Sequence, residues 1–473
     1  MAVAESLDQA EAAIENYCES RTAPSIFREV YKMKTAQIAD YGSRGAYSYV
    51  LFVFFIYIVG LHLRLTVYSG GKILIPLYLM LASFLLLAPK YFWPMLNKAG
   101  YGFLGLVVFT CAQPFLTFAP GSALGTLHST LHMVASVATT TMMIYALSTV
   151  PKAKVRRLAL VVWGVMLALA VLESTGLKPV FDQVRDVLYA GTGRFVYSSD
   201  MRDIEIYGKV RSTVFATEPS FLADTLCVLI LTVVVLDEKS GKKWLLIKAA
   251  SMLLASFILA PSLKMIFYMV SASLWVYWPT TKKGLERSIV LLIFAAVFGT
   301  IGYMLFFAFL EGAIGKHMNS GSFYGRIAVA PIVGFRAISD YPIFGYGIGN
   351  TDGLSEIIFE AWQSSGAFDL FPWFQNFPAN NLMTNGFWWQ WSFLGVFGGL
   401  LFVLLVRKWL VALGEEYPAR TIVCVWIVWY SGFAFIDPVS WSIFMFFTIG
   451  GLKRADDAQD ASVGGQRSSN SPI

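Results

Sequence analysis

Long apolar runs separated by short polar connections make up most of the chain between residues 45 and 452. A helix that crosses a membrane needs about 20 predominantly apolar residues, within a range of about 17–25. The pattern therefore predicts an all-α integral membrane protein with about twelve transmembrane helices. The predicted spans are residues 45–63, 73–88, 101–118, 124–148, 157–173, 218–236, 244–260, 262–278, 289–308, 386–406, 420–436 and 438–452.

Lysine and arginine gather in every second connection between these runs. Loops that stay in the cytoplasm carry an excess of these residues, so the alternation predicts that both termini are cytoplasmic. Residues 1–44 would form a cytoplasmic arm, 45–454 the transmembrane domain and 455–473 a flexible cytoplasmic tail. The basic connections hold Lys90 and Lys98; Lys152, Lys154, Arg156 and Arg157; Lys239, Lys242 and Lys243; Lys282, Lys283 and Arg287; and Arg407 and Lys408.

Two connections on the opposite, extracytoplasmic side are long: residues 174–217 and 309–385. Loops of this length are usually functional or disordered. Both are rich in aromatic residues, which argues against disorder. We therefore expect the functional chemistry in these two loops.

Composition supports lipid as the solvent and excludes several other classes of protein. The chain is 56% hydrophobic and 14% charged, whereas a soluble globular chain carries about 25% charged residues. The net charge of +6 lies mostly in short loops, so it is interpreted as a topology signal and no nucleic-acid partner is expected. The four cysteines have no metal or disulfide spacing.

The first candidate for chemistry runs from Arg211 to Glu218-Pro219-Ser220, where the loop 174–217 meets a span. Ionisable groups at that depth usually face a polar cavity and have a function. Pro219 suits the first turn of a helix, and Glu218 would lie near its positive end. The alternative is an interfacial salt bridge with a helix cap.

The second candidate combines Arg326 and Arg336 with the glycine-rich stretch from Gly345 to Asn350. Guanidinium groups bind phosphate oxygens in a bidentate fork, and glycines let backbone N–H groups approach a ligand. The alternative is a glycine-rich turn with surface arginines. Lys264 would add a positive group, unless it extends to the lipid headgroups.

Histidines and aromatic residues give weaker signals. His128 and His132 share a helix face, but no third ligand is evident and no metal site is expected. His317 is a candidate base or substrate contact. The aromatic residues of the loop 309–385 are candidates to bind sugar faces, with an interfacial belt as the alternative; they are Trp362, Phe368, Phe371, Trp373, Phe374 and Phe377.

Three stretches together resemble the bacterial superfamily of Wzy-type polysaccharide polymerases and O-antigen ligases, over roughly residues 170–400. Arg211 through Glu218-Pro219-Ser220 is similar to its arginine-led motif, with Val214 in place of a common glycine. Pro342-Ile-Phe-Gly-Tyr-Gly-Ile-Gly-Asn350 resembles its glycine-rich stretch. Thr384-Asn385 followed by Gly395 and Gly398 resembles a ligase motif. Because Thr384 stands where a ligase has histidine, the resemblance favours a polymerase.

The resemblance implies a GT-C-like glycosyltransferase of the bacterial inner membrane, without metal or cofactor, acting on undecaprenyl-diphosphate-linked oligosaccharide. It also implies a flippase and a chain-length regulator as partners. Because negative charge grows on the departing diphosphate, we expect Arg211 and Arg336 to meet around it and Glu218 to be the base. The expected substrate-binding residues are Arg326, Lys264, His317, Tyr324 and Asn385.

Two other functions fit the same pattern less well. An O-antigen ligase or another lipid-linked sugar transferase would deliver the glycan to a different acceptor. A transporter or flippase for lipid-linked sugars usually has two related halves and a midplane site. This chain has no such repeat, and its candidate charges lie in the two long loops.

Overall fold

A computed structural model describes residues 45–69, 72–75, 77–121, 123–192, 196–198, 200–279 and 324–452. The chain forms two compact units, residues 1–52 and 53–473, and the fold of the second unit positions the candidate site. The predicted span 289–308 and His317 lie outside the described residues.

The described residues are predominantly helical, as the apolar pattern predicts. The α-helices are Gly45–Leu63, α3 (Tyr78–Leu116), α4 (Ala123–Ser148), α5 (Lys152–Leu172), α6 (Lys178–Tyr189), α7 (Asp200–Tyr207), α8 (Pro219–Val235), α9 (Lys242–Leu259), α10 (Lys264–Tyr277), α13 (Val329–Asp340), α14 (Thr351–Ser364), α15 (Ala367–Leu370), α16 (Ala379–Leu382), α17 (Gly386–Leu413), α18 (Pro418–Tyr430) and α19 (Pro438–Gly451). Short helical turns η1 (Glu173–Leu177), η2 (Tyr324–Ala328) and η3 (Pro372–Asn376) join some of them.

Five helical stretches of the described chain are long and apolar enough to cross a membrane: Gly45–Leu63, Tyr78–Leu116, Gly125–Ser148, Lys152–Tyr189 and Gly386–Leu413. Three shorter apolar helices accompany them, namely α8, α18 and α19. The fold is thus that of a helical, membrane-type protein. The total of twelve spans stays a prediction.

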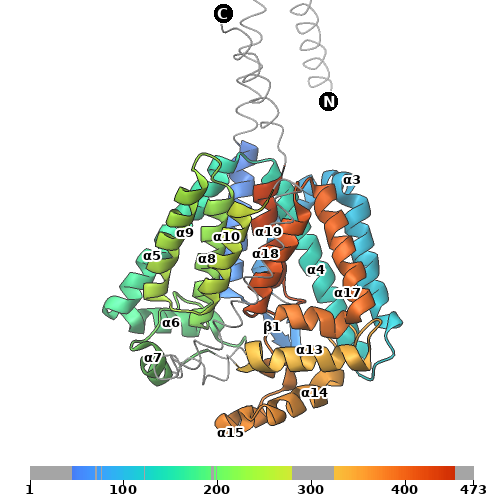
Figure 1. Ribbon diagram of the computed structural model, residues 1–473. Helices are drawn as coiled ribbons and strands as arrows, with labels where there is room; N and C mark the ends of the chain where they lie inside the picture. The colour runs from blue at the N-terminus through green and yellow to red at the C-terminus, as the bar shows by residue number, and fades with distance from the viewer. Residues whose placement is uncertain are drawn as a thin grey trace, which may run out of the picture. The chain divides into compact units, whose positions relative to one another are not determined.

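The helices of the second unit pack in two groups around a central pair. Figure 1 shows α5, α8, α9 and α10 side by side on the left, α3, α4 and α17 on the right, and α18 and α19 between them. α19 packs against both α4 and α8, and α18 packs against α10 and α17. The central pair therefore connects the helices that carry the candidate residues.

The predicted span 73–88 is wrong at its beginning. Residues Lys72–Ile75 form strand β2, which pairs antiparallel with β1, Val67–Ser69. β-Branched residues such as Ile73 and Ile75 favour a strand, and helix α3 begins only at Tyr78. The apolar run thus begins with the second strand of a hairpin and continues as a helix.

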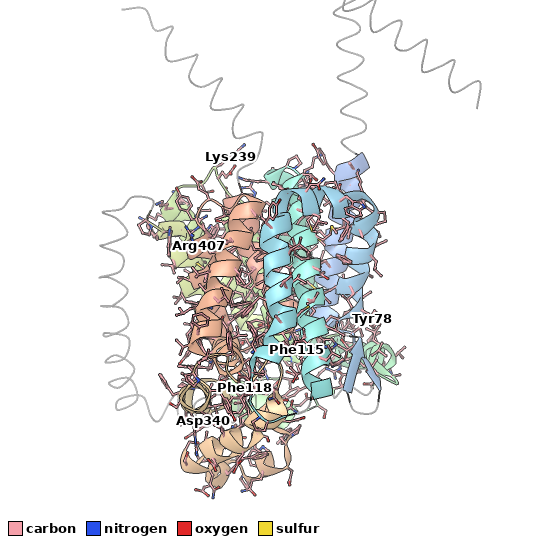
Figure 2. All side chains as sticks on the ribbon, turned by 90° about the vertical axis from the view of Figure 1, so that its right-hand side faces the viewer. Tyr78, Phe115, Phe118, Lys239, Asp340 and Arg407 are labelled. Carbon is pink, nitrogen blue, oxygen red and sulfur yellow. The ribbon has the colours of Figure 1, made fainter. Side chains whose placement is uncertain are left out.

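α3 is also continuous through residues 89–100, where the charge pattern predicts a loop. Figure 2 nevertheless shows Tyr78 and Phe115, near the two ends of α3, toward the same lower end of the bundle. The helix therefore bends back on itself. Pro89 and Pro94 lie inside it and interrupt the hydrogen-bond ladder, which is a common cause of such bends.

The described parts of both long loops are ordered into helices. The loop 174–217 contains α6 and α7, and residues 324–385 contain α13 to α16. α6 is amphipathic, since Phe181 and Tyr189 are buried whereas the polar Gln183 and Asp186 are exposed. Figure 1 shows α6, α7, α13 and α14 at one end of the helices of the second unit.

Candidate functional site

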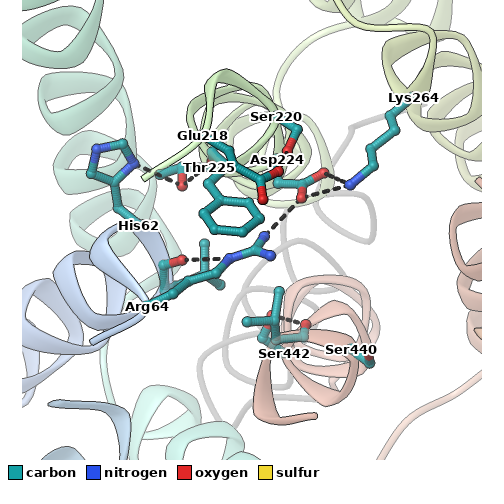
Figure 3. A network of polar contacts seen from close by, with 12 residues as sticks. His62, Arg64, Glu218, Ser220, Asp224, Thr225, Lys264, Ser440 and Ser442 are labelled. Carbon is teal, nitrogen blue, oxygen red and sulfur yellow. Dashed lines mark hydrogen bonds and ion pairs between the residues drawn. The ribbon is translucent and has the colours of Figure 1, made fainter. Parts of the chain in front are cut away.

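A buried carboxylate at the beginning of α8 joins two cationic side chains from elsewhere in the chain. Asp224 is 1% exposed. One of its oxygens lies 2.7 Å from an Arg64 guanidinium nitrogen and 2.9 Å from the Lys264 ammonium (Figure 3). A buried charge is tolerated when it is paired and hydrogen-bonded. The contacts thus bring together the end of the Gly45–Leu63 helix, α8 and α10.

Arg64 is held in an unusual backbone conformation. Its φ of 49° lies in the left-handed region, which non-glycine residues adopt at a cost of order 1–3 kcal/mol. The conformation ends the preceding helix and directs the side chain toward α8. Its guanidinium carbon lies 3.7 Å from the centre of the Phe221 ring, so a cation–π contact adds to the ion pair with Asp224.

Lys264 and Arg326 flank the turn after α18. A Cβ built on Gly432 would lie 3.4 Å from the Lys264 ammonium and 3.7 Å from Arg326 Nε. The Lys264 ammonium also lies 4.7 Å from the centre of the Phe433 ring. The Lys264 and Arg326 cations therefore both lie close to Gly432, and a side chain at this position would come between them.

Asn385 connects Arg326 to the two adjoining helices. Its amide nitrogen donates to the backbone carbonyls of Arg326 (2.8 Å) and Tyr430 (3.0 Å), and its side-chain oxygen accepts from Trp388 N–H at the start of α17. Arg326 Nε donates to Thr384 Oγ1 over 3.3 Å. The structure thus brings together the predicted residues Lys264, Arg326 and Asn385.

Glu218 and Tyr324 adjoin this group. Glu218 is the residue before α8, and its carboxylate accepts a 3.0 Å hydrogen bond from Ser220. Ser220 lies one turn before Asp224 on the same helix face, as Figure 3 shows. Tyr324 begins η2, two residues before Arg326, and its ring packs edge-on against Phe371 at 5.6 Å.

A carboxylate that the sequence analysis missed holds the segment before Glu218. Glu173 is 3% exposed and accepts hydrogen bonds from Thr213 N–H, Thr213 Oγ1 and Val214 N–H. The segment is strained, since Val214 and Phe215 have φ of 47° and 69°. His62 Nε2 lies 2.7 Å from the Val214 carbonyl. Only the depth of Glu173 near the end of an apolar run could have indicated it.

The expected meeting of Arg211 and Arg336 does not occur. Arg211 pairs with buried Asp203 of α7 at 2.8 Å. Burial alone would lower the pKa of Arg211, but hydrogen bonding to Asp203 raises it overall, so the guanidinium stays charged. Arg336 pairs with Glu360 of α14, and both side chains are about half-exposed, at 51% and 43%. α13 buries Val333 and Ala337, which turns Arg336 outward.

The glycine-rich stretch uses most of its backbone N–H groups to pack against neighbouring segments. The N–H groups of Tyr346 and Gly347 donate to the carbonyls of Ser392 and Phe393 in α17, and Ile348 N–H donates to Gln113. A Cβ on Gly345 would lie 2.5 Å from Gly395 N. Two of the stretches that carry the family resemblance therefore bind each other through their backbones.

The remaining candidates are the two histidines of α4 and the aromatic cluster that adjoins Tyr324 through Phe371. The His128 and His132 rings are 4.1 Å apart, and no group of three metal-ligating side chains occurs within the described residues. The aromatic residues of the loop 309–385 form one cluster, in which Trp362 is buried and Trp373 is 57% exposed. No family model, curated protein or solved structure matches the chain.

Proposed function

We propose that the chain is a polysaccharide polymerase, which joins undecaprenyl-diphosphate-linked oligosaccharide units at the outer face of the bacterial inner membrane. The observation that carries the proposal is the convergence of Arg64, Lys264 and Arg326 beside the beginning of α8. Three cationic groups from separate segments, two of which share the single carboxylate of Asp224, suit a ligand with several phosphate oxygens. In this proposal the three groups bind the diphosphate, the role that the sequence analysis expected of Arg211 and Arg336. These two arginines do not contact the diphosphate in the proposal.

The reaction is a glycosyl transfer. A hydroxyl of the incoming unit forms a bond to the anomeric carbon of the growing chain, while the bond from that carbon to the phosphate oxygen breaks. The electron pair leaves with undecaprenyl diphosphate, where the cationic groups stabilise it. The hydroxyl proton goes to Glu218, which adjoins the cationic groups through Ser220.

The lengths of the surrounding helices support a lipid-linked substrate. α10, α18 and α19 contain 14, 13 and 14 residues, which gives a rise of about 20 Å against a hydrocarbon layer of about 30 Å. Their ends near Lys264 and Phe433 would therefore lie below the membrane surface. Non-helical backbone at such depth is tolerated where it is buried in protein or lines a polar cavity, and a polyprenyl carrier presents its diphosphate near this level.

Thr384 supports a polymerase over a ligase. It stands where the ligase motif has histidine, and it accepts the hydrogen bond from Arg326 Nε. The Thr384 hydroxyl thus orients the Arg326 guanidinium, and it cannot act as a base in the way that a histidine imidazole can. In the proposed polymerase, Glu218 takes the role of the base instead.

The test uses the purified full chain in detergent with undecaprenyl-diphosphate-linked repeat units and EDTA. We expect Arg326→Gln and Lys264→Gln each to slow polymer formation about 100-fold or more, which is the usual effect of losing one group that stabilises the transition state. Glu218→Gln should slow it about 10²–10⁴-fold. Arg336→Gln is the matched control and should polymerise at a rate close to wild type.

Thermal unfolding of each variant separates loss of chemistry from loss of fold. A folded Arg326→Gln variant with wild-type polymerisation would contradict the proposal. Transfer of carrier-linked units across the membrane of proteoliposomes, without joining them, would indicate a flippase and would also contradict it. Delivery of single units to another acceptor would indicate a ligase and would contradict it as well.

A further inference from the structure

A cavity of about 430 Å³ lies between α3 and α17. Two of its lining residues are cationic, Arg407 and Lys408, and most of the others are apolar or aromatic. The lining residues are Tyr101, Gly102, Leu405, Arg407, Lys408, Val411 and Ala412. The cavity thus combines positive charge with an apolar wall.

Beside the cavity, α3 and α17 touch without a side chain between them. A Cβ on Gly102 would lie 2.7 Å from Trp409 Cα, so only glycine allows this approach. Trp409 is fully buried, and its indole N–H donates to Thr141 Oγ1 over 3.1 Å. The close contact at Gly102 and the buried Trp409 thus hold the two helices together at one edge of the cavity.

Among the described residues, no carboxylate neutralises the charges in the cavity. Within the part of the chain that the structure describes, no ion pair or hydrogen bond engages the Arg407 or Lys408 side chain. Other basic residues contrast with them, since Arg156 and Lys248 both pair with Asp237. Figure 2 shows Arg407 and Lys239 toward the upper part of the bundle and Asp340 and Phe118 at the opposite end.

Exposed apolar residues lie on both helices, in the cavity and along the helices beyond it. Tyr101 is 99% exposed and Val108 63% exposed on α3, and Leu404 is 55% exposed on α17. These rows suit acyl chains, which an inorganic anion does not have. An unneutralised arginine and lysine at a membrane surface attract anionic lipid headgroups.

We propose that this cavity binds an anionic glycerophospholipid, with its phosphate between Arg407 and Lys408 and its acyl chains along α3 and α17. The site is separate from the residues assigned to glycosyl transfer and does not depend on that function. A bound lipid would fill the crease between the two helices and stabilise their contact.

The test titrates phosphatidylglycerol onto the purified full chain and counts bound lipid by native mass spectrometry. Arg407→Gln/Lys408→Gln should weaken binding roughly 30-fold. Ala412→Phe fills the cavity without changing its charge and should weaken binding as well. The control Lys239→Gln/Lys243→Gln removes the same charge from exposed positions outside the cavity and should bind as the wild type does.

Three outcomes would overturn the proposal. One is wild-type binding by folded Arg407→Gln/Lys408→Gln. The second is an equal loss in the Lys239→Gln/Lys243→Gln control, which would indicate diffuse surface charge. The third is displacement of phosphatidylglycerol by an equal concentration of inorganic phosphate, which would indicate a free-anion site. Thermal unfolding midpoints confirm that the variants are folded.

Discussion

Asp224 is the residue on which the arrangement of the cationic groups depends. Asp224→Asn removes the carboxylate that Arg64 and Lys264 share. Removing one partner of a buried ion pair costs about 3–5 kcal/mol because the remaining charge is left uncompensated. We therefore expect a clear fall in the thermal unfolding midpoint in detergent. Glu360→Gln is the control, since its pair with Arg336 is about half-exposed and contributes about 0–1 kcal/mol.

A double variant separates the ion pair from other effects at this position. Asp224→Asn with Lys264→Met removes both charges, so its loss of stability should be smaller than the sum of the two single losses. The unfolding midpoints of the four proteins measure this coupling. Strictly additive losses would mean that the pair between Asp224 and Lys264 contributes nothing.

Glu173 is predicted to act through the segment that precedes Glu218. Glu173→Gln keeps one acceptor oxygen in place of a carboxylate that receives three hydrogen bonds from Thr213 and Val214. Hydrogen bonds to charged groups contribute about 1.5–3 kcal/mol each, so the variant should unfold at a lower temperature. Exposed Glu205→Gln should not change the midpoint. Equal midpoints for both variants would argue against this role.

The sequence identified cations more reliably than their partners. Lys264, Arg326 and Asn385 are three of the five predicted substrate-binding residues, and they lie together. Arg64 and Asp224 were not predicted, because a single charge inside an apolar run does not indicate which distant segment it faces. Arg211 was placed wrongly with respect to Arg336 for the same reason, since its partner Asp203 lies on a short helix that no apolar pattern indicates.

At the scale of elements, Gly395 is the position where α17 tolerates no side chain. It has φ 64° and ψ −170° inside the helix, a conformation essentially limited to glycine. A Cβ there would lie 2.6 Å from Gly345 N. Gly395→Ala should therefore abolish folding or lower the unfolding midpoint strongly.

Gly164 provides the matched control within α5. A Cβ at Gly164 would meet nothing within 4 Å, and alanine is favoured over glycine in a helix interior by about 0.5–1 kcal/mol. Gly164→Ala should leave the midpoint unchanged or raise it slightly. Similar losses in the two variants would contradict the contact between the glycine-rich stretch and α17.

The apolar pattern located most helices but not their interruptions. The spans 124–148 and 438–452 agree closely with α4 and α19, because each is a single apolar run bounded by turn residues. The run after residue 72 was predicted as one helix although it begins with strand β2. Hydropathy measures burial in lipid or protein and does not by itself distinguish a short strand from a helix.

At the scale of the whole molecule, the two proposed sites consist of different residues on different helices. The cationic groups beside α8 lie on segments joined by α18 and α19, whereas the lipid cavity lies between α3 and α17. α17 contributes to both, because Asn385 caps its first turn and Arg407 and Lys408 lie near its other end. A lipid that stabilises the contact between α17 and α3 would therefore also stabilise the helix whose N-cap, Asn385, bonds to the Arg326 backbone.

The connection between α17 and α18 predicts how stability depends on pH. Burial raises the pKa of Glu415 to about 7 from its ordinary value of 4.5, while Arg420 opposes the shift. Because the folded protein holds this proton more tightly than the unfolded chain, the contribution to stability is fully present below about pH 4.5. It is lost as pH rises through about 7.

The connection also joins the ends of two helices, so the titration acts on the fold as a whole. Glu416 N–H donates to the Gly451 carbonyl over 3.1 Å, and Glu415 bridges to Leu452 beyond α19. The unfolding midpoint of the wild type should fall between pH 5 and pH 8. In Glu415→Gln, which stays neutral throughout, this fall should be smaller by an amount of order 3 kcal/mol in unfolding free energy. A parallel pH dependence in Glu415→Gln and the wild type would show that Glu415 is ionised in the fold at all these values, with Arg420 outweighing its burial.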